Sequence, residues 1–242
     1  MEQNYHYKKH FITAMLVIAV YAVVMQLLPI LIIKPAQTLL ASTTINPGGF
    51  SIVICALLAL VICLWLTRDK EYWASVFTKP REPFSTVVLW GVIGFVLVLI
   101  GQGLAALIEV KFLGIPTGSQ NTADIVEAAK VAPSLLLVVT VIGPILEEFV
   151  FRRSIFGVLL KPTNYLIAAL ISSLMFAVIH LEFTHLLVYA VSGFVFSFVY
   201  YKTRSIWTPI IAHVLLNSFV SIVNLNVDKI DMIQQQWIIW FY

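Results

Sequence analysis

Long apolar segments account for most of this 242-residue chain, and they restrict what it can fold into. About 20 helical residues cross the hydrocarbon core of a bilayer, and a helix satisfies its own backbone polar groups where water is absent. Seven segments approach or exceed this length: Phe11–Ile33, Phe50–Leu66, Thr86–Ile108, Pro133–Leu160, Tyr165–His180, His185–Tyr201 and Trp207–Asn224. Charged residues make up 11% of the chain, against about 25% in soluble domains. We therefore predict an all-α integral membrane protein, a bundle of about seven transmembrane helices.

The distribution of Lys and Arg predicts the orientation of this bundle. With the N-terminus inside, the inner connections hold Lys8, Lys9, Arg68, Lys70, Lys79, Arg81, Lys161, Lys202 and Arg204, and the outer ones hold Lys34, Lys111, Lys130 and Lys229. The inner side is the more basic, so the positive-inside rule predicts the N-terminus inside and the C-terminus outside. The first apolar run is longer than a signal-peptide core, so we expect a retained signal-anchor helix.

We expect residues 1–242 to form one membrane domain, with helices of unassigned role in 1–132 and a catalytic core in 133–224. The basic connection Thr67–Ser85 is interpreted as a cytoplasmic connector. The polar outer segment Gly114–Ala132 has a short helix predicted after Asn121-Thr122, and it either gates a substrate or only connects two spans. The apolar tail Trp237–Tyr242 is too short to span and is expected at the interface.

Several features exclude other classes of function. Cys55 and Cys63 lie in one apolar segment, so no disulfide framework is expected, and they are interpreted as small core residues. No basic block alternates with aromatic residues, so nucleic acid is not an expected partner. Glu182 and His185 fall in a short outer turn and are expected to be solvated, with the alternative that His185 reaches the site.

Three polar motifs interrupt the last apolar segments: Glu147-Glu148-x-x-x-Arg152, Phe176-x-x-x-His180 and His213-x-x-x-Asn217. A charged side chain at the centre of a membrane helix costs about 2.5–3.5 kcal/mol on insertion scales. Counting about 1.5 Å per residue from the predicted inner helix ends places Glu147 about 20 Å, His180 about 22 Å and His213 about 15 Å deep. The motifs are therefore predicted to meet in one layer of the membrane and to form one site.

Helical spacing separates the two carboxylates. Glu148 and Arg152 are four residues apart and share a helix face, so they are predicted to pair. Glu147 is turned by about 100° from its neighbour, which leaves it free to titrate as a general base.

His213 and Asn217 share a face by the same spacing, and an imidazole with an amide can donate two hydrogen bonds to an oxyanion. Phe176 lies one turn before His180 and is predicted to wall or orient it. Pro144, which lacks an N–H, is expected to free a carbonyl and bend the helix near the acidic pair.

The ordered trio of motifs, over Pro144–Asn217, resembles the CPBP family of intramembrane proteases, which includes CAAX prenyl endopeptidases and the bacteriocin-processing and self-immunity proteins of the Abi group. The resemblance implies that Glu147 and His180 activate a water for peptide-bond hydrolysis. It assigns His213 and Asn217 to the oxyanion, with Glu148 and Arg152 supporting the base. The prenyl endopeptidases are described with eight spans, against seven predicted here.

Two forms of this chemistry stay open. In one form a zinc ion is bound by Glu147, His180 and His213, with water as its fourth ligand. In the other form the same residues act without a metal. The predicted partners are membrane lipids and a membrane-associated peptide or protein, such as a pheromone or bacteriocin precursor, in a bacterial plasma membrane. The alternatives are a non-catalytic scaffold or immunity protein and a proton-coupled transporter. The transporter predicts internal repeats or paired broken helices, and the sequence shows neither.

Overall fold

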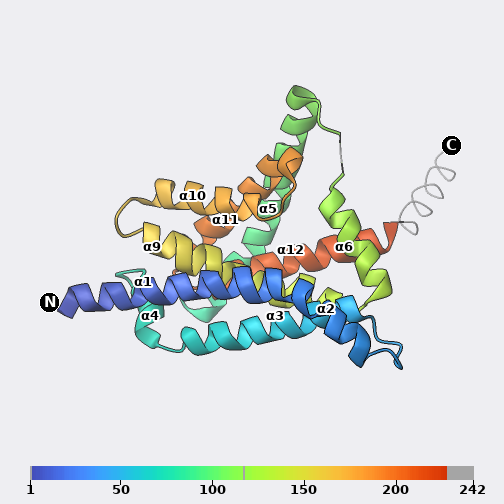
Figure 1. Ribbon diagram of the computed structural model, residues 1–242. Helices are drawn as coiled ribbons and strands as arrows, with labels where there is room; N and C mark the ends of the chain where they lie inside the picture. The colour runs from blue at the N-terminus through green and yellow to red at the C-terminus, as the bar shows by residue number, and fades with distance from the viewer. Residues whose placement is uncertain (1, 117, 228–242) are drawn as a thin grey trace.

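The computed structural model describes residues 2–116 and 118–227, and within them every regular element is helical (Figure 1). The first half comprises α1 (Glu2–Val20), α2 (Leu28–Leu39), α3 (Pro47–Leu66), α4 (Lys70–Ala74), α5 (Phe84–Leu113) and α6 (Gln120–Val131). The second half comprises α7 (Leu135–Leu137), α8 (Gly143–Glu148), α9 (Gly157–Leu159), α10 (Tyr165–Val178), α11 (Leu186–Thr203) and α12 (Trp207–Leu225). The predicted interfacial tail Trp237–Tyr242 lies outside the described residues.

In the described part of the chain, five helical segments are long and apolar enough to cross a membrane: Lys8–Leu39, Pro47–Leu66, Phe84–Leu113, Phe183–Thr203 and Trp207–Leu225. They coincide with five of the predicted spans. The other two predicted spans are also helical, α10 as a shorter apolar helix and the motif segment as a run of short helices from α7 to α9. The prediction of an all-helical membrane bundle is confirmed, whereas the count of seven and the orientation stay predictions.

The helices pack around the motif segment. The rod formed by α1, the π-helical segment Tyr21–Leu27 and α2 lies against α3, and α1 also contacts the motif segment. On the other side α10 packs on α11, while α5 packs on both α11 and α12 and rises steeply past them in Figure 1. The motif segment therefore lies in the interior of the bundle.

Polar residues at the helix starts act as caps and set where several helices begin. The side chains of Asn46, Ser119 and Asn164 accept hydrogen bonds from the N–H groups of Gly49, Thr122 and Ile167. Such caps satisfy donors that a helix start leaves unpaired. Ser119 thereby starts α6, the short helix predicted in the Gly114–Ala132 connection, and its existence is confirmed.

The motif segment is an irregular helix, because π-helical stretches at Val138–Ile142 and Phe149–Phe156 flank α8. The N–H of Gly143 bonds to the Val138 carbonyl five residues back, and Pro144 has no N–H to offer the next carbonyl, that of Val139. A Cβ on Gly143 would lie 2.9 Å from the Val138 oxygen, so only glycine fits this turn without a shift. Gly143 and Pro144 therefore leave one backbone carbonyl, that of Val139, for a partner outside the helix.

The connection Thr67–Ser85 is folded onto this segment. Arg153 is 2% exposed, its guanidinium lies 3.5 Å from the centre of the Tyr72 ring, and it donates to the Tyr72 carbonyl and to Ser75 Oγ. The Tyr72 hydroxyl is 3.1 Å from Ser154 Oγ. The connection is thus a packed part of the bundle that fixes the C-terminal part of the motif segment.

Candidate active site

The three motifs meet at one cavity of about 900 Å³. Its wall includes Glu147, Phe176, His180, His213 and Asn217. These residues come from α8, α10, the turn after α10 and α12, so the structure brings together residues that are far apart in the sequence. The depth count predicted this convergence.

Glu148 lies behind the cavity wall and joins two of the motifs. Its Oε2 is 3.2 Å from Arg152 Nε, and both side chains are fully buried, which confirms the predicted pair. Its Oε1 is 2.8 Å from His213 Nδ1, a contact between helices that the spacing along one helix did not reveal. One carboxylate therefore balances the Arg152 charge and also orients the imidazole.

Arg152 is held by aromatic rings as well as by Glu148. Its guanidinium carbon lies 4.5 Å from the centre of the Phe176 ring and 5.0 Å from that of Phe196, and one guanidinium nitrogen donates to the Gly193 carbonyl at 3.3 Å. Contacts of a cation with ring faces stabilise it where water is excluded. Phe176 therefore supports the arginine in addition to walling His180, whose ring centre is 4.8 Å away.

Glu147 is the accessible carboxylate of the pair. Its side chain is 17% exposed against 0% for Glu148. The Tyr21 hydroxyl donates to Glu147 Oε1 at 3.3 Å, and His213 Nε2 lies 3.6 Å from Oε2. Tyr21 belongs to the first helical rod, and nothing in its sequence context singled it out.

His180 and Asn217 each have one polar atom engaged by backbone. His180 Nδ1 is 2.8 Å from the Phe176 carbonyl, and its ring stacks on Tyr189 with centres 4.1 Å apart. Asn217 Nδ2 donates to the Val139 carbonyl at 3.0 Å, the group that Gly143 and Pro144 leave without a helical donor. The Asn217 side-chain amide has two N–H donors, and the bond to Val139 uses one of them.

Glu182 and His185 are partly exposed, and both also have partners in the fold. His185 Nδ1 is 2.8 Å from Glu109 Oε2, and His185 lines the cavity. Glu182 accepts hydrogen bonds from Ser119 Oγ at 2.7 Å, from the backbone N–H of Gln120 at 2.6 Å and from the Tyr189 hydroxyl at 2.9 Å. The reason is that Ser119 and Gln120, at the start of α6, lie against this turn.

These contacts change the acidity of Glu182. Burial alone would raise its pKa, but the hydrogen bonds from Ser119, Tyr189 and the backbone around Gln120 together hold the pKa of Glu182 below its usual value. Glu182 therefore stays a carboxylate that ties α6 to the turn before α11.

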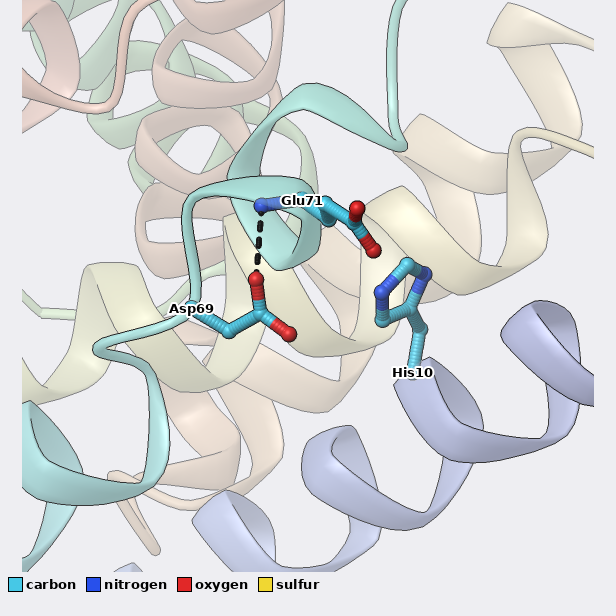
Figure 2. Close-up of side chains that lie close together, drawn as sticks. All are labelled: His10, Asp69 and Glu71. Carbon is cyan, nitrogen blue, oxygen red and sulfur yellow. Dashed lines mark hydrogen bonds between the residues drawn. The ribbon is translucent and has the colours of Figure 1, made fainter.

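The predicted zinc ligands do not fit an ion as they are arranged. Within residues 2–116 and 118–227, the donor atoms of Glu147, His180 and His213 do not gather within 4.8 Å of one another, whereas those of His10, Asp69 and Glu71 do (Figure 2). In that second cluster Asp69 accepts from the Glu71 N–H at 2.9 Å and from Lys9 Nζ at 2.7 Å. The hydrogen bonds from Lys9 and Glu71 lower the pKa of Asp69, so we interpret this carboxylate as the cap of α4 and as an ion pair to α1.

The fold and the cavity define a polytopic helical membrane protein with a buried site of carboxylate, imidazole and amide groups. Residues 130–219 match the family model described as type II CAAX prenyl endopeptidase Rce1-like. Together with the two relatives described next, this match shows that the chain belongs to the Rce1-like CAAX protease family, and the resemblance of its motifs is confirmed.

Bacterial relatives agree with this assignment. The chain is 38% identical over 180 residues to the putative membrane peptidase YdiL of Bacillus subtilis (strain 168), covering 74% of this chain and 72% of the relative. It is 31% identical over 224 residues to the membrane-embedded CAAX protease MroQ of Staphylococcus aureus (strain USA300), covering 88% and 89%. No solved structure matches the chain significantly. We conclude that this is an integral bacterial membrane protein and a membrane-embedded endopeptidase.

Proposed function

We propose that the chain hydrolyses a peptide bond of a membrane-associated peptide or protein with a water activated by Glu147. The observation that carries this proposal is the placement of Glu147 on the cavity wall, 3.6 Å from His213 and beside the fully buried pair of Glu148 and Arg152. One carboxylate is accessible and the next is fixed, as a division into base and support requires.

The roles of the imidazoles follow from their second nitrogen. Because Glu148 accepts from His213 Nδ1, Nε2 faces Glu147 and the cavity. When His213 carries both ring protons, its positive charge and that of Arg152 balance the two carboxylates of Glu147 and Glu148. In this form His213 Nε2 carries a proton and can donate it in a hydrogen bond to an oxyanion. Asn217 contributes its second amide N–H from the same face of α12.

His180 is proposed to share the base role with Glu147, as the family resemblance implies. Its Nδ1 lies at hydrogen-bond distance from the Phe176 carbonyl, which leaves Nε2 as the acceptor on the ring. In the proposed reaction the attacking water loses a proton to this pair, the tetrahedral oxyanion forms beside His213 and Asn217, and the proton then passes to the leaving amine.

The substrate is proposed to be a short membrane-associated peptide, such as a pheromone or bacteriocin precursor. Cavities of 300–1,000 Å³ enclose ligands of drug size, so the cavity of about 900 Å³ admits a short extended stretch of peptide. The relative MroQ is named a CAAX protease, which supports a peptide substrate at the membrane.

The test is cleavage of a membrane peptide by purified protein in nanodiscs. Glu147→Gln keeps the shape but removes the base and is expected to lower kcat by about 10²-fold or more. Glu127→Gln changes an exposed carboxylate on α6 and is the matched control. Full activity in folded Glu147→Gln protein would refute the mechanism. Cleavage is expected to persist in a chelator, and a loss that added zinc restores would instead assign a metal to the site.

A further inference from the structure

A second carboxylate and imidazole pair lies in the wall of the same cavity. Glu109, in the last turns of α5, is 1% exposed and has its Oε2 2.8 Å from His185 Nδ1. Its other oxygen, Oε1, is buried and has no hydrogen-bond donor within the part of the chain that the structure describes. The catalytic roles proposed above do not involve this pair.

A buried carboxylate oxygen without a donor is costly. Burial removes the water that would otherwise bind it, and an unpaired charged group loses more than a neutral one. The Glu148 carboxylate differs in charge balance, because its Oε2 has no hydrogen-bond donor among the described residues either but lies 3.2 Å from the Arg152 guanidinium, while its Oε1 is 2.8 Å from His213 Nδ1. Glu109 has one such partner, so a cationic donor that reached Oε1 would be bound favourably.

The charge of the cavity favours the same kind of ligand. Among the described residues of its wall, no Lys or Arg is present, and the carboxylates are Glu109 and Glu147, of which Glu147 is balanced by the protonated His213 proposed above. Arg152 lies behind Phe176 and is already paired with Glu148. A third carboxylate, Glu182, lies next to the wall through its bonds to Ser119 and Tyr189. The cavity therefore attracts positive charge and disfavours negative charge.

We infer that Glu109, with His185, forms a subsite for a cationic group of the substrate, a lysine or arginine side chain or a free amino group. The carboxylate would accept a charge-assisted hydrogen bond from the ammonium or guanidinium group. This inference rests on the proposed function for its substrate, because the cationic group belongs to the peptide that Glu147 is proposed to cleave. It makes the enzyme selective for peptides with a positive charge in an otherwise apolar stretch.

The experiment measures binding, so that it does not depend on cleavage. The probes are fluorescently labelled apolar peptides of identical length that carry one Lys, one norleucine or one Glu, and this residue is placed at each position of the peptide in turn. Binding of each peptide to Glu147→Gln protein in nanodiscs is measured by fluorescence anisotropy. At one position the Lys peptide is expected to bind about tenfold more tightly than the norleucine peptide, at the scale of a charge-assisted hydrogen bond. The Glu peptide is expected to bind most weakly.

The same comparison in a Glu109→Gln background assigns the preference to this residue. Glutamine still accepts from His185 but has no charge, so the ratio of Lys to norleucine affinity is expected to fall to about one. Glu127→Gln, on the exposed face of α6, is expected to keep the tenfold ratio. Gel filtration and thermal melting check that each variant is folded.

The outcomes separate this inference from the proposed function. Equal binding of the Lys and norleucine peptides at every position overturns the subsite even if Glu109→Gln protein does not fold, because that comparison uses an intact Glu109. A preference that survives Glu109→Gln also overturns it. A Lys preference that depends on Glu109 in a protein that cleaves no peptide would support the subsite and refute the protease mechanism.

Discussion

Replacing Glu148 with glutamine is expected to destabilise the protein strongly, because it leaves the Arg152 charge without its partner. Arg152 and Glu148 are both fully buried and lie 3.2 Å apart. Removing one partner of a buried ion pair costs about 3–5 kcal/mol. For a chain of this size, each kcal/mol lowers the midpoint of thermal unfolding by about 2–4 °C. We therefore expect Glu148→Gln to melt about 6–20 °C below the wild type.

The assay is thermal unfolding of purified protein in one detergent, followed by intrinsic fluorescence. Glu147→Gln is the internal control, because it makes the same chemical change one residue earlier at a side chain that is 17% exposed and has no arginine partner. It is expected to melt within about 2 °C of the wild type while losing cleavage. The double variant Glu148→Gln with Arg152→Met removes both charges and is expected to recover part of the lost stability, since replacing a buried pair with neutral groups is far less costly than breaking it.

A Glu148→Gln protein that melts within 2 °C of the wild type would refute the argument that this pair supports the site. So would a double variant that is less stable than the single one, because the cost would then not arise from the unpaired Arg152 charge.

Three further changes test the neighbouring contacts. Gly143→Ala places a Cβ 2.9 Å from the Val138 oxygen and is expected to lower the free energy of unfolding by about 1–3 kcal/mol through overpacking. Gly103→Ala is the control, because a Cβ there has no neighbouring atom within 4 Å, and it should not lower the melting temperature. Equal melting temperatures of the two variants would contradict the tight turn at Gly143. Asn217→Leu leaves the Val139 carbonyl without its donor and is expected to cost about 1–3 kcal/mol as well as activity, so a variant of unchanged stability would show that this bond does not matter. Tyr21→Phe removes the donor to Glu147 and is expected to lower kcat by a few-fold, about 0.5–1.5 kcal/mol, with melting unchanged; an unchanged kcat would remove Tyr21 from the site.

The sequence by itself determined the apolar helices and predicted which polar residues of the last helices line one cavity. A segment of about 20 apolar residues crosses a bilayer as a helix, because a helix pairs its own backbone N–H and C=O groups where water is absent. The all-helical fold class could therefore be predicted without knowledge of the packing. The pairing of Glu148 with Arg152 was also predictable, because residues four apart meet on one helix in any fold. The similar depths of Glu147, His180 and His213 predicted that they lie in one layer of the membrane.

Only the tertiary structure decided which helices present those residues to one another. The contacts of Glu148 with His213, of Tyr21 with Glu147 and of Glu109 with His185 join segments that are 65, 126 and 76 residues apart. Depth and periodicity fix the height and the face of a side chain on its own helix, but the rotation of one helix against another depends on the packing of every residue between them. The irregular turn around Gly143 and the contacts of Ser119 and Gln120 with Glu182 also depend on hydrogen bonds to distant partners, which one-dimensional patterns do not contain.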